Sequence, residues 1–230
     1  MLPILYSLQH CPYAMRARLG LLMARQQVML RAVTTKDKPA EMLAISPKGT
    51  IPVLMLPDSR VIDESLDIML WALQQDDPED LLHKDQPEDL PAMLELISRN
   101  DQDFKPQLEI YKKAKRFRLE TEIEERQKCE VFIAELEQSL SGNQQAVEEG
   151  SEGEASGGYF IGQKPGLIDY ALLPFVRQFS RVNRAWFIAA PYPNLRAWLD
   201  RHLQSRVYSK AMAKYPLWLD KHEESVLGES

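Results

Sequence analysis

The first 76 residues combine short apolar runs with stretches whose apolar residues have helical spacing. Four runs have the length of buried strands: 2–7, 28–33, 51–56 and 60–62. Three other stretches have the spacing of helices: 11–25, 40–45 and 64–75. A strand, helix and strand in succession predict a right-handed parallel crossover, and the last two strands are close enough to form a hairpin. We therefore predict an α/β domain of order β-α-β-α-β-β-α.

The pattern changes after this domain. The segment QQDDPEDLLHKDQPEDLP contains three prolines and many acids, which is typical of a linker. Beyond it, strand signals nearly vanish and helical patterns follow one another: 90–115, 120–140, 168–181, 194–204 and 205–213. The predicted organisation is an α/β domain over 1–76, a linker over 77–89 and an all-helical domain over 90–230.

One stretch of the helical part, residues 141–158, has an unusual composition. It contains five of the ten glycines and four glutamates, with no basic or aromatic residue. Such a segment buries too little apolar surface to offset the entropy of ordering it. We predict a flexible acidic insertion between two helices, a solvated loop without a function of its own.

Charge and composition narrow the possible functions. The net charge is −6 and the pI is about 5.4, which disfavours nonspecific binding to nucleic acid. Residues 1–76 carry 8 basic and 7 acidic side chains, so the acidity belongs to the helical part. The N-terminus does not resemble a signal peptide, and no apolar stretch is long enough for a membrane span. Only two widely separated cysteines are present, which favours a reducing, cytoplasmic location over a secreted disulfide scaffold.

Cys11 lies in the sequence QHCPYAMRAR, directly before a proline. Proline favours the first position of a helix, so Pro12 predicts that Cys11 is the N-cap. A sulfur there faces free backbone N–H groups and the positive end of the helix dipole, and both favour the thiolate. Arg16 and Arg18 follow and add positive charge. The alternative, a half-buried structural cysteine, remains open at this point.

The residues after Cys11 bear on how such a thiol would react. Dithiol oxidoreductases use C-x-x-C, whereas this chain has C-P-Y-A and lacks the second thiol at Ala14. Cys129 is predicted on a distant helix. If Cys11 is reactive, the resolving thiol must come from solution, and glutathione is the abundant cytosolic one.

Two further stretches suggest a peptide-like ligand. Ile51-Pro52, in SPKGTIPVL, is a candidate cis peptide at a strand start, where the backbone of residue 51 is exposed for pairing. Glu64 and Ser65, in VIDESLDI, lie at a helix start, where they can receive an ammonium and a carboxylate. Each has a plainer interpretation: Ser65 as an N-cap, and Lys38 as a solvated loop lysine. Together with a thiolate, these groups describe a site for a small γ-glutamyl peptide.

At this point the chain resembles the cytosolic glutathione transferases, in particular the cysteine-type omega class and glutaredoxin-2-like members. The similarity rests on CPYAMRARL, KGTIPVL, DESLDI and YFIGQKPGLIDYALLPFV and extends over nearly the whole chain. It implies a thioredoxin-like first domain, an all-helical second domain, and in many members a homodimer.

The resemblance also implies roles for individual residues. Cys11 would form a mixed disulfide with glutathione, beside Tyr13. The glutathione contacts would come from Lys38, Ile51 with Pro52, Glu64 and Ser65. The implied activity is thiol transfer, dehydroascorbate reduction or deglutathionylation, with glutathione as co-substrate, no metal, and a small thiol, disulfide or electrophile as second substrate.

Two departures from the family pattern accompany this resemblance. The helical signature usually has Ser or Thr three residues before its aspartate, and here Gly166 precedes Asp169, which we expect to be structural. The other departure is the 141–158 insertion. Two alternatives to the enzyme remain open: a noncatalytic interaction or regulatory protein on the same fold, and a ligand-storage protein.

Overall fold

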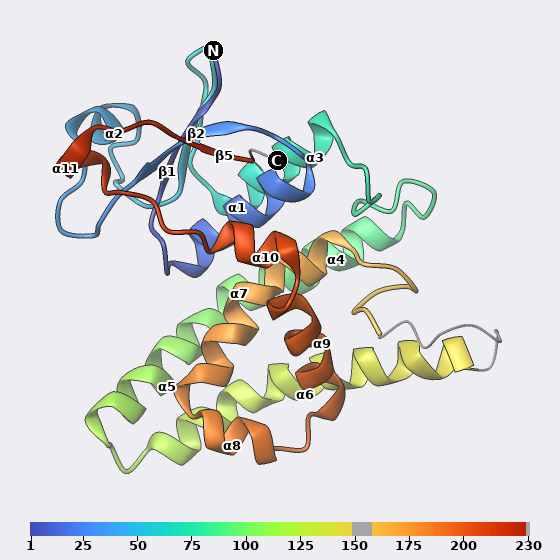
Figure 1. The fold of residues 1–230 in the computed structure, drawn as a ribbon. Coiled ribbons are helices and arrows are strands. Elements are labelled where there is room, and N and C mark those ends of the chain that lie inside the picture. Colours follow the sequence, from blue (N-terminus) through green and yellow to red (C-terminus); the bar gives the residue numbers. More distant parts are fainter. Residues whose placement is uncertain (149–157, 229–230) are drawn as a thin grey trace. The chain divides into compact units, whose positions relative to one another are not determined.

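A computed structural model describes residues 1–148 and 158–228 (Figure 1). The chain divides into two compact units. The first combines Met1–Glu79 with Gln204–Ser230, and the second is Asp80–Leu203.

The first unit is built on a five-stranded mixed sheet of order β4-β3-β1-β2-β5. Its strands are β1 (Ile4–Ser7), β2 (Val28–Ala32), β3 (Val53–Met55), β4 (Val61–Ile62) and β5 (Ser225–Leu227). β1 and β2 are parallel, and the other three pairs are antiparallel. The parallel crossover and the β3–β4 hairpin confirm the two connections predicted from the apolar runs.

Helices of the first unit come from both ends of the chain. They are α1 (Pro12–Met23), α2 (Ala40–Ile45), α3 (Ser65–Gln75), α10 (Arg206–Ala211) and α11 (Trp218–Lys221). The long helices α1 and α3 pack closely against each other, and α10 also packs against α1. Leu5, Leu19, Leu30 and Ile68 are fully or nearly fully buried, so the core lies between the sheet and these helices.

The second unit is entirely helical in its described residues. Its elements are α4 (Asp89–Arg99), the π-helical turn η1 (Asn100–Phe104), α5 (Lys105–Phe117), α6 (Glu122–Glu148), α7 (Leu167–Val182), α8 (Arg184–Ala189) and α9 (Pro193–Leu203). Phe104, Tyr111 and Phe179 form an aromatic cluster in its core, with ring centroids 5.9–6.0 Å from that of Phe179. Among the described residues, no helix is long and apolar enough to cross a membrane.

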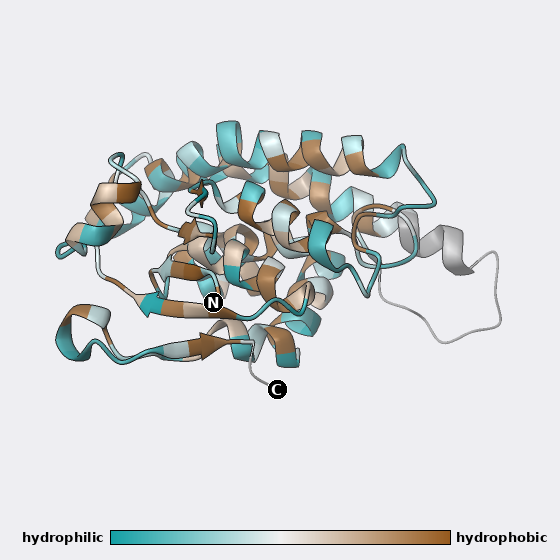
Figure 2. Cartoon of the chain, turned by 90° about the horizontal axis from the view of Figure 1, so that it is seen from above, coloured by the Kyte–Doolittle hydropathy of each residue, from teal (hydrophilic) through white to brown (hydrophobic). Residues whose placement is uncertain are grey.

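The hydropathy of the residues varies around the helices and along the strands. Figure 2 shows helices with hydrophobic and hydrophilic residues on different sides, and a hydrophobic last strand beside the C-terminus. An α/β unit with a mixed sheet, joined to an all-helical unit, confirms the predicted fold class.

Several boundaries differ from those predicted. The pattern over 90–115 is not one regular helix, because η1 interrupts it. α6 continues to Glu148, eight residues beyond the predicted end at residue 140 and into the predicted insertion. The remainder of the insertion, 149–157, lies outside the described residues.

The C-terminal segment differs most from its prediction. Residues 204–230 were expected in the helical domain, whereas the structure groups them with the first unit. β5 pairs with β2, and Trp218 donates to a Glu41 oxygen at 2.6 Å while the Arg31 guanidinium stacks 4.0 Å from its ring centroid. Figure 1 shows this segment running beside α1 and returning to the sheet. The pairing depends on residues about 200 positions apart, which local patterns do not reveal.

Candidate functional site

Cys11 is the N-cap residue of α1, with Pro12 at the first helical position, as the sequence predicted. Cys11 ends the loop that follows β1, and the Cys11 N–H donates to the Leu8 carbonyl at 3.3 Å. The side chain is half-buried and the thiol is free. The thiol therefore lies at the dipole's positive end and remains accessible.

The sulfur itself does not cap the helix. No backbone N–H of α1 donates to it, and Sγ instead lies 3.8 Å from the Ile51 carbonyl oxygen. A carbonyl accepts from the protonated thiol, whereas a thiolate has no proton to give it. Ionisation of Cys11 would thus favour a turn of the side chain from Ile51 towards the free amides of α1.

A buried arginine holds the loop that carries Cys11. The Arg18 guanidinium donates to the Leu8 and Gln9 carbonyls at 3.2 and 2.7 Å, to Ser7 Oγ, and to the Ala211 carbonyl at 2.7 Å. Burial lowers the pKa of Arg18 to about 10, and the charge of Cys11 acts in the opposite direction. Arg18 therefore ties the loop to the C-terminal segment and attracts a thiolate at Cys11.

The Ile51-Pro52 peptide is cis, as the sequence suggested. It brings the carbonyl of Ile51 beside Cys11, so the predicted strand start and the predicted thiol do meet. Lys38 lies by the same segment, because its Nζ is 3.6 Å from the position that a Cβ on Gly49 would occupy. Gly49 has φ +62°, a conformation that suits glycine in this turn.

Glu64 and Ser65 lie at the start of α3, with Glu64 as N-cap residue and Ser65 buried at the first helical position. Glu64 is exposed and accepts from Lys48 Nζ at 2.6 Å. Burial alone would lower the pKa of Lys48, but the hydrogen bonds to Glu64 and Asp63 outweigh it and raise the pKa. An ammonium arriving at Glu64 must therefore compete with Lys48.

Ser65 is connected to the helix that carries Cys11. Arg16, fully buried on α1, points Nη1 at Ser65 Oγ with a separation of 3.5 Å. The Arg16 guanidinium also lies 5.7 Å from the ring centroid of Tyr13, which is half-buried and lies two residues after Cys11. All seven predicted site residues belong to the first unit. Cys11 contacts the Ile51 carbonyl, and Arg16 connects Ser65 with Tyr13.

Sequence reasoning treated Arg16 and Arg18 only as sources of positive charge and did not single out Lys48. Each of the three organises the site by a contact distant in sequence: 49 positions for Arg16 with Ser65, 193 for Arg18 with Ala211, and 16 for Lys48 with Glu64. The one available signal was the presence of two arginines, which are seldom buried, within an otherwise largely apolar helical stretch.

Asp169 is structural, as expected. Its Oδ2 accepts from the Gly166 N–H at 2.9 Å at the start of α7, and its Oδ1 accepts from Trp198 Nε1 at 2.8 Å. The structure also explains the glycine. A Cβ on Gly166 would lie 2.9 Å from the Met93 sulfur and 3.4 Å from His83 Nε2, so these side chains occupy the space of the usual Ser or Thr.

Several solved structures are similar to this one in fold. The yeast protein Ure2p, in complex with S-p-nitrobenzylglutathione, has a TM-score of 0.76 at 16% identity, covering 92% of this chain and 94% of that one. Glutathione transferase Omega 3C from Trametes versicolor has a TM-score of 0.73 at 20% identity, covering 95% and 92%. Such likeness at low identity concerns the fold. No sequence among curated proteins matches the chain.

Two family models match the chain in order. The glutathione S-transferase N-terminal domain matches residues 5–80, and the glutathione S-transferase C-terminal domain matches residues 119–201. The first range covers most of residues 1–79, which belong to the first unit, and the second range covers most of the second unit. Because both the N-terminal and the C-terminal domain of this family are matched, the chain belongs to the glutathione S-transferase family.

Proposed function

We propose that this protein is a glutathione-dependent thiol transferase or reductase that acts through a mixed disulfide at Cys11. The observation that carries the proposal is the position of the Cys11 sulfur, at the N-cap of α1 and 3.8 Å from the backbone carbonyl oxygen of Ile51, the residue before Pro52. A cysteine at this position favours thiol–disulfide exchange, for which a thiolate near a helix N-terminus is the nucleophile.

The exchange proceeds in two balanced steps. The Cys11 thiolate attacks the glutathione sulfur of a mixed disulfide, the S–S bond breaks, and the other thiolate leaves and takes a proton from water. A second glutathione, as thiolate, then attacks the enzyme-bound glutathione sulfur, which releases glutathione disulfide and the Cys11 thiolate. An external thiol is needed because the other cysteine, Cys129, is buried in the second unit. Cytoplasmic glutathione would supply it.

The same site offers the contacts for the tripeptide. The backbone of Ile51, next to Pro52, would pair with the cysteinyl part. Ser65 would receive the γ-glutamyl carboxylate at the start of α3, and Glu64 would receive its ammonium. Lys38 would meet the glycine carboxylate, and Tyr13 would line the space beside the sulfur. These assignments are supported by the common location of the residues in one unit.

The decisive experiment compares the two cysteines. We expect Cys11→Ser to lower the rate of reduction of a small glutathione mixed disulfide by about 100-fold or more, because a serine hydroxyl stays protonated at neutral pH. Cys129→Ser is the matched control and should retain the rate. The measurement is a coupled assay of glutathione disulfide formation, together with intact mass for glutathione bound to Cys11.

Retention of the rate in Cys11→Ser would overturn the mechanism. Absence of activity in the unmodified protein, with no mass increase by one glutathione, would favour a second candidate: a noncatalytic regulatory protein on the same fold. That candidate has one observation in its favour, because a similar structure is described as the nitrogen regulation fragment of the yeast prion protein Ure2p. Thermal stabilisation by glutathione without turnover would be its signature.

A further inference from the structure

Basic side chains gather around a hollow of the second unit, where the C-terminal halves of α5 and α7 lie side by side. The hollow has a volume of about 350 Å³ and is lined by Lys112, Lys115, Arg116, Arg177, Gln178, Arg181 and Val182. The three residues from α5 belong to the run YKKAKRFR, which takes no part in the proposed thiol chemistry. The lining contains five cations and no carboxylate, although the net charge of the chain is −6.

A second hollow adjoins the first, because Arg181 lines both. It has a volume of about 270 Å³ and is lined by Ser180, Arg181, Arg184, Phe187, Ile188, Arg196, Leu199, Asp200 and Leu203. Much of this lining is apolar, and Ile188 is 58% exposed. Figure 1 shows α8, which carries Ile188, following directly from the end of α7. The residues that line the two hollows together are called the basic surface below.

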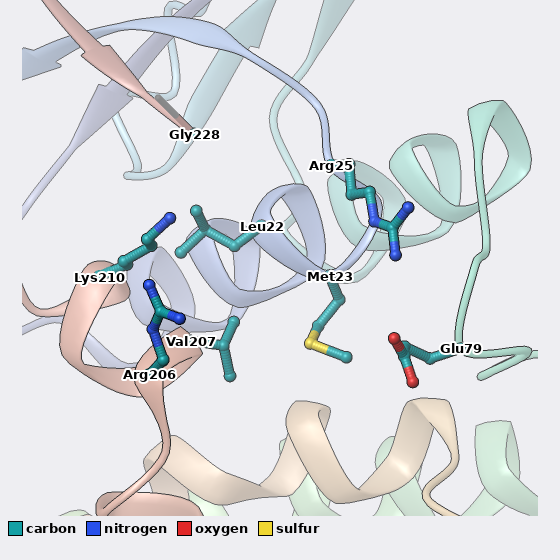
Figure 3. Close-up of a pocket in the computed structure, with 8 residues that line it drawn as sticks. All are labelled: Leu22, Met23, Arg25, Glu79, Arg206, Val207, Lys210 and Gly228. Carbon is teal, nitrogen blue, oxygen red and sulfur yellow. The ribbon is translucent and has the colours of Figure 1, made fainter. Parts of the chain in front are cut away.

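The charge of this surface is unusual for the chain. Figure 3 shows another hollow, in the first unit, where the carboxylate of Glu79 lies on the same side as Arg25 and the lining has both signs of charge. On the basic surface one carboxylate, that of Asp200, accompanies seven cations. Concentrated positive charge of this kind attracts a negatively charged partner and speeds its approach.

Three exposed arginines of the basic surface are open to a partner. Arg116, Arg181 and Arg184 form no ion pair with any acidic residue in the ranges 1–148 and 158–228. The two lining lysines differ, because each is paired with a glutamate at 2.8 Å. The arginine fork binds a carboxylate through two parallel hydrogen bonds, and arginine is enriched at protein interfaces. These three arginines can therefore bind carboxylates without first breaking an ion pair.

Exposed apolar side chains beside the arginines indicate the kind of partner. Phe117 is 59% exposed and its ring centroid lies 5.6 Å from the Arg116 guanidinium, while Ile188 lines the same hollow as Arg184. An acidic protein segment offers both carboxylates and apolar side chains to such a surface. A nucleic-acid backbone offers charge alone in a dense row, and its approach is opposed by the net negative charge of the chain.

We propose that the basic surface binds an acidic segment of another protein, with an apolar residue among its carboxylates. The carboxylates bind Arg116, Arg181 and Arg184, and the apolar residue packs on Ile188. The surface lies wholly within the second unit. It includes neither Cys11 nor any residue assigned to glutathione, so the proposal stands independently of the proposed function.

The test is a fluorescence-anisotropy titration of the full chain with three labelled probes of matched length and charge. The first is the capped peptide DEDELEDED, the second is the same peptide with serine in place of leucine, and the third is a nine-nucleotide RNA of uridines. We expect saturable binding of the leucine peptide, several-fold weaker binding of the serine peptide and at least tenfold weaker binding of the RNA. Added salt should weaken binding of the leucine peptide, because the arginines are exposed.

Charge-matched variants separate this surface from the rest of the chain. The triple variant Arg116→Gln/Arg181→Gln/Arg184→Gln should lose at least tenfold in affinity for the leucine peptide. The control removes the same charge at three exposed lysines that line neither hollow, by Lys36→Gln, Lys84→Gln and Lys214→Gln. It should lose less than twofold. A thermal melt verifies that both variants are folded.

A further variant tests the apolar contact. Ile188→Ser should bind the leucine peptide several-fold more weakly and leave the affinity for the serine peptide unchanged, because only the first probe has a side chain to pack there. The side chain is exposed, so its replacement should not unfold the protein.

Four results would overturn the proposal: no saturable binding of the leucine peptide, equal binding of the leucine and serine peptides, RNA binding as tight as that of the leucine peptide, or equal losses in the arginine variant and its lysine control. The third result would make the surface a nucleic-acid site. Cys11→Ser should bind the leucine peptide normally, and the arginine variant should reduce glutathione mixed disulfides at the wild-type rate. A failure here is therefore distinguishable from a failure of the thiol transferase proposal.

Discussion

Cys11 and Cys129 show how far environment changes one residue type. Cys11 is half-buried at a helix N-terminus, in contact with solvent and with a backbone carbonyl. Cys129 on α6 is 1% exposed, and burial raises its pKa to about 12. At neutral pH the buried sulfur is therefore protonated and shielded, and only the sulfur at the N-cap is available for chemistry.

This contrast predicts the outcome of thiol labelling. With iodoacetamide at pH 7.5, we expect the folded protein to gain one label, on Cys11, because alkylation requires an accessible thiolate. In denaturant both cysteines should be labelled. Peptide mass spectrometry identifies the sites. Labelling of Cys129 in the folded protein at a rate similar to that of Cys11 would contradict the burial shown here.

At the scale of elements, the packing of α1 on α3 sets the frame of the site, because α1 carries Cys11 and α3 begins at Ser65. The two helices approach each other closely at Gly20. A Cβ there would lie 2.5 Å from Met69 Cγ and 2.8 Å from Met69 Cα, and the second of these is backbone that cannot move alone. The absence of a side chain at position 20 thus permits the observed packing.

Gly20→Ala should therefore destabilise the protein. Overpacking costs about 1–3 kcal/mol and opposes a gain of about 1 kcal/mol in helix propensity, so we expect a net loss of up to about 2 kcal/mol in the free energy of unfolding. Gly142→Ala on α6 is the matched control, since a Cβ there meets nothing within 4 Å. It should stabilise by roughly 0.5–1 kcal/mol. Urea denaturation measures both, and equal effects would contradict the close approach.

At the scale of the whole molecule, stability in acid depends on two buried groups that share a neighbour. Asp169 on α7 accepts from Trp198 on α9, and the His202 ring centroid lies 4.9 Å from that of Trp198. Burial raises the pKa of Asp169 to about 6. Burial, aided by the charge of Arg201, lowers the pKa of His202 to about 4. The two shifts have opposite signs and cover nearly the same pH range.

Their effects on stability oppose each other. Between pH 6.5 and 4 the unfolded chain binds a proton at His202 that the folded protein does not, so acid destabilises. Between pH 6 and 3.8 the folded protein binds a proton at Asp169 that the unfolded chain does not, so acid stabilises. In the wild type the two contributions largely cancel between about pH 6 and 4.

Removing one group should therefore reveal the other. Relative to the wild type, Asp169→Asn should lose stability more steeply as pH falls from 6 to 4, and His202→Gln should lose it less steeply. The difference in slope should amount to on the order of 2 kcal/mol across the range. Urea unfolding at several pH values measures it, and variants whose curves run parallel to that of the wild type would refute the assignment.

Local patterns in the sequence determined much of this protein. Apolar runs of strand length and apolar residues at helical spacing predicted every strand and helix of residues 1–76. The reason is that such patterns arise from residues that are close together in the chain. The proline after Cys11 predicted the N-cap for the same local reason, and Ile51-Pro52 indicated the cis bond. These signals were enough to bring forward Cys11, Ile51 and Ser65 as members of one site.

Only the tertiary structure decided what depends on contacts between distant residues. The short elements α8, α11 and β5 have too few residues for a period to emerge, and β5 exists because β2 offers it an open edge. The same return of the chain brings the Ala211 carbonyl to Arg18, which donates a hydrogen bond to it. The hydrogen bonds by which Arg18 holds the Cys11 loop to the C-terminal segment could not be predicted from the sequence, because a side chain's distant partners are fixed by packing rather than by its neighbours in the chain.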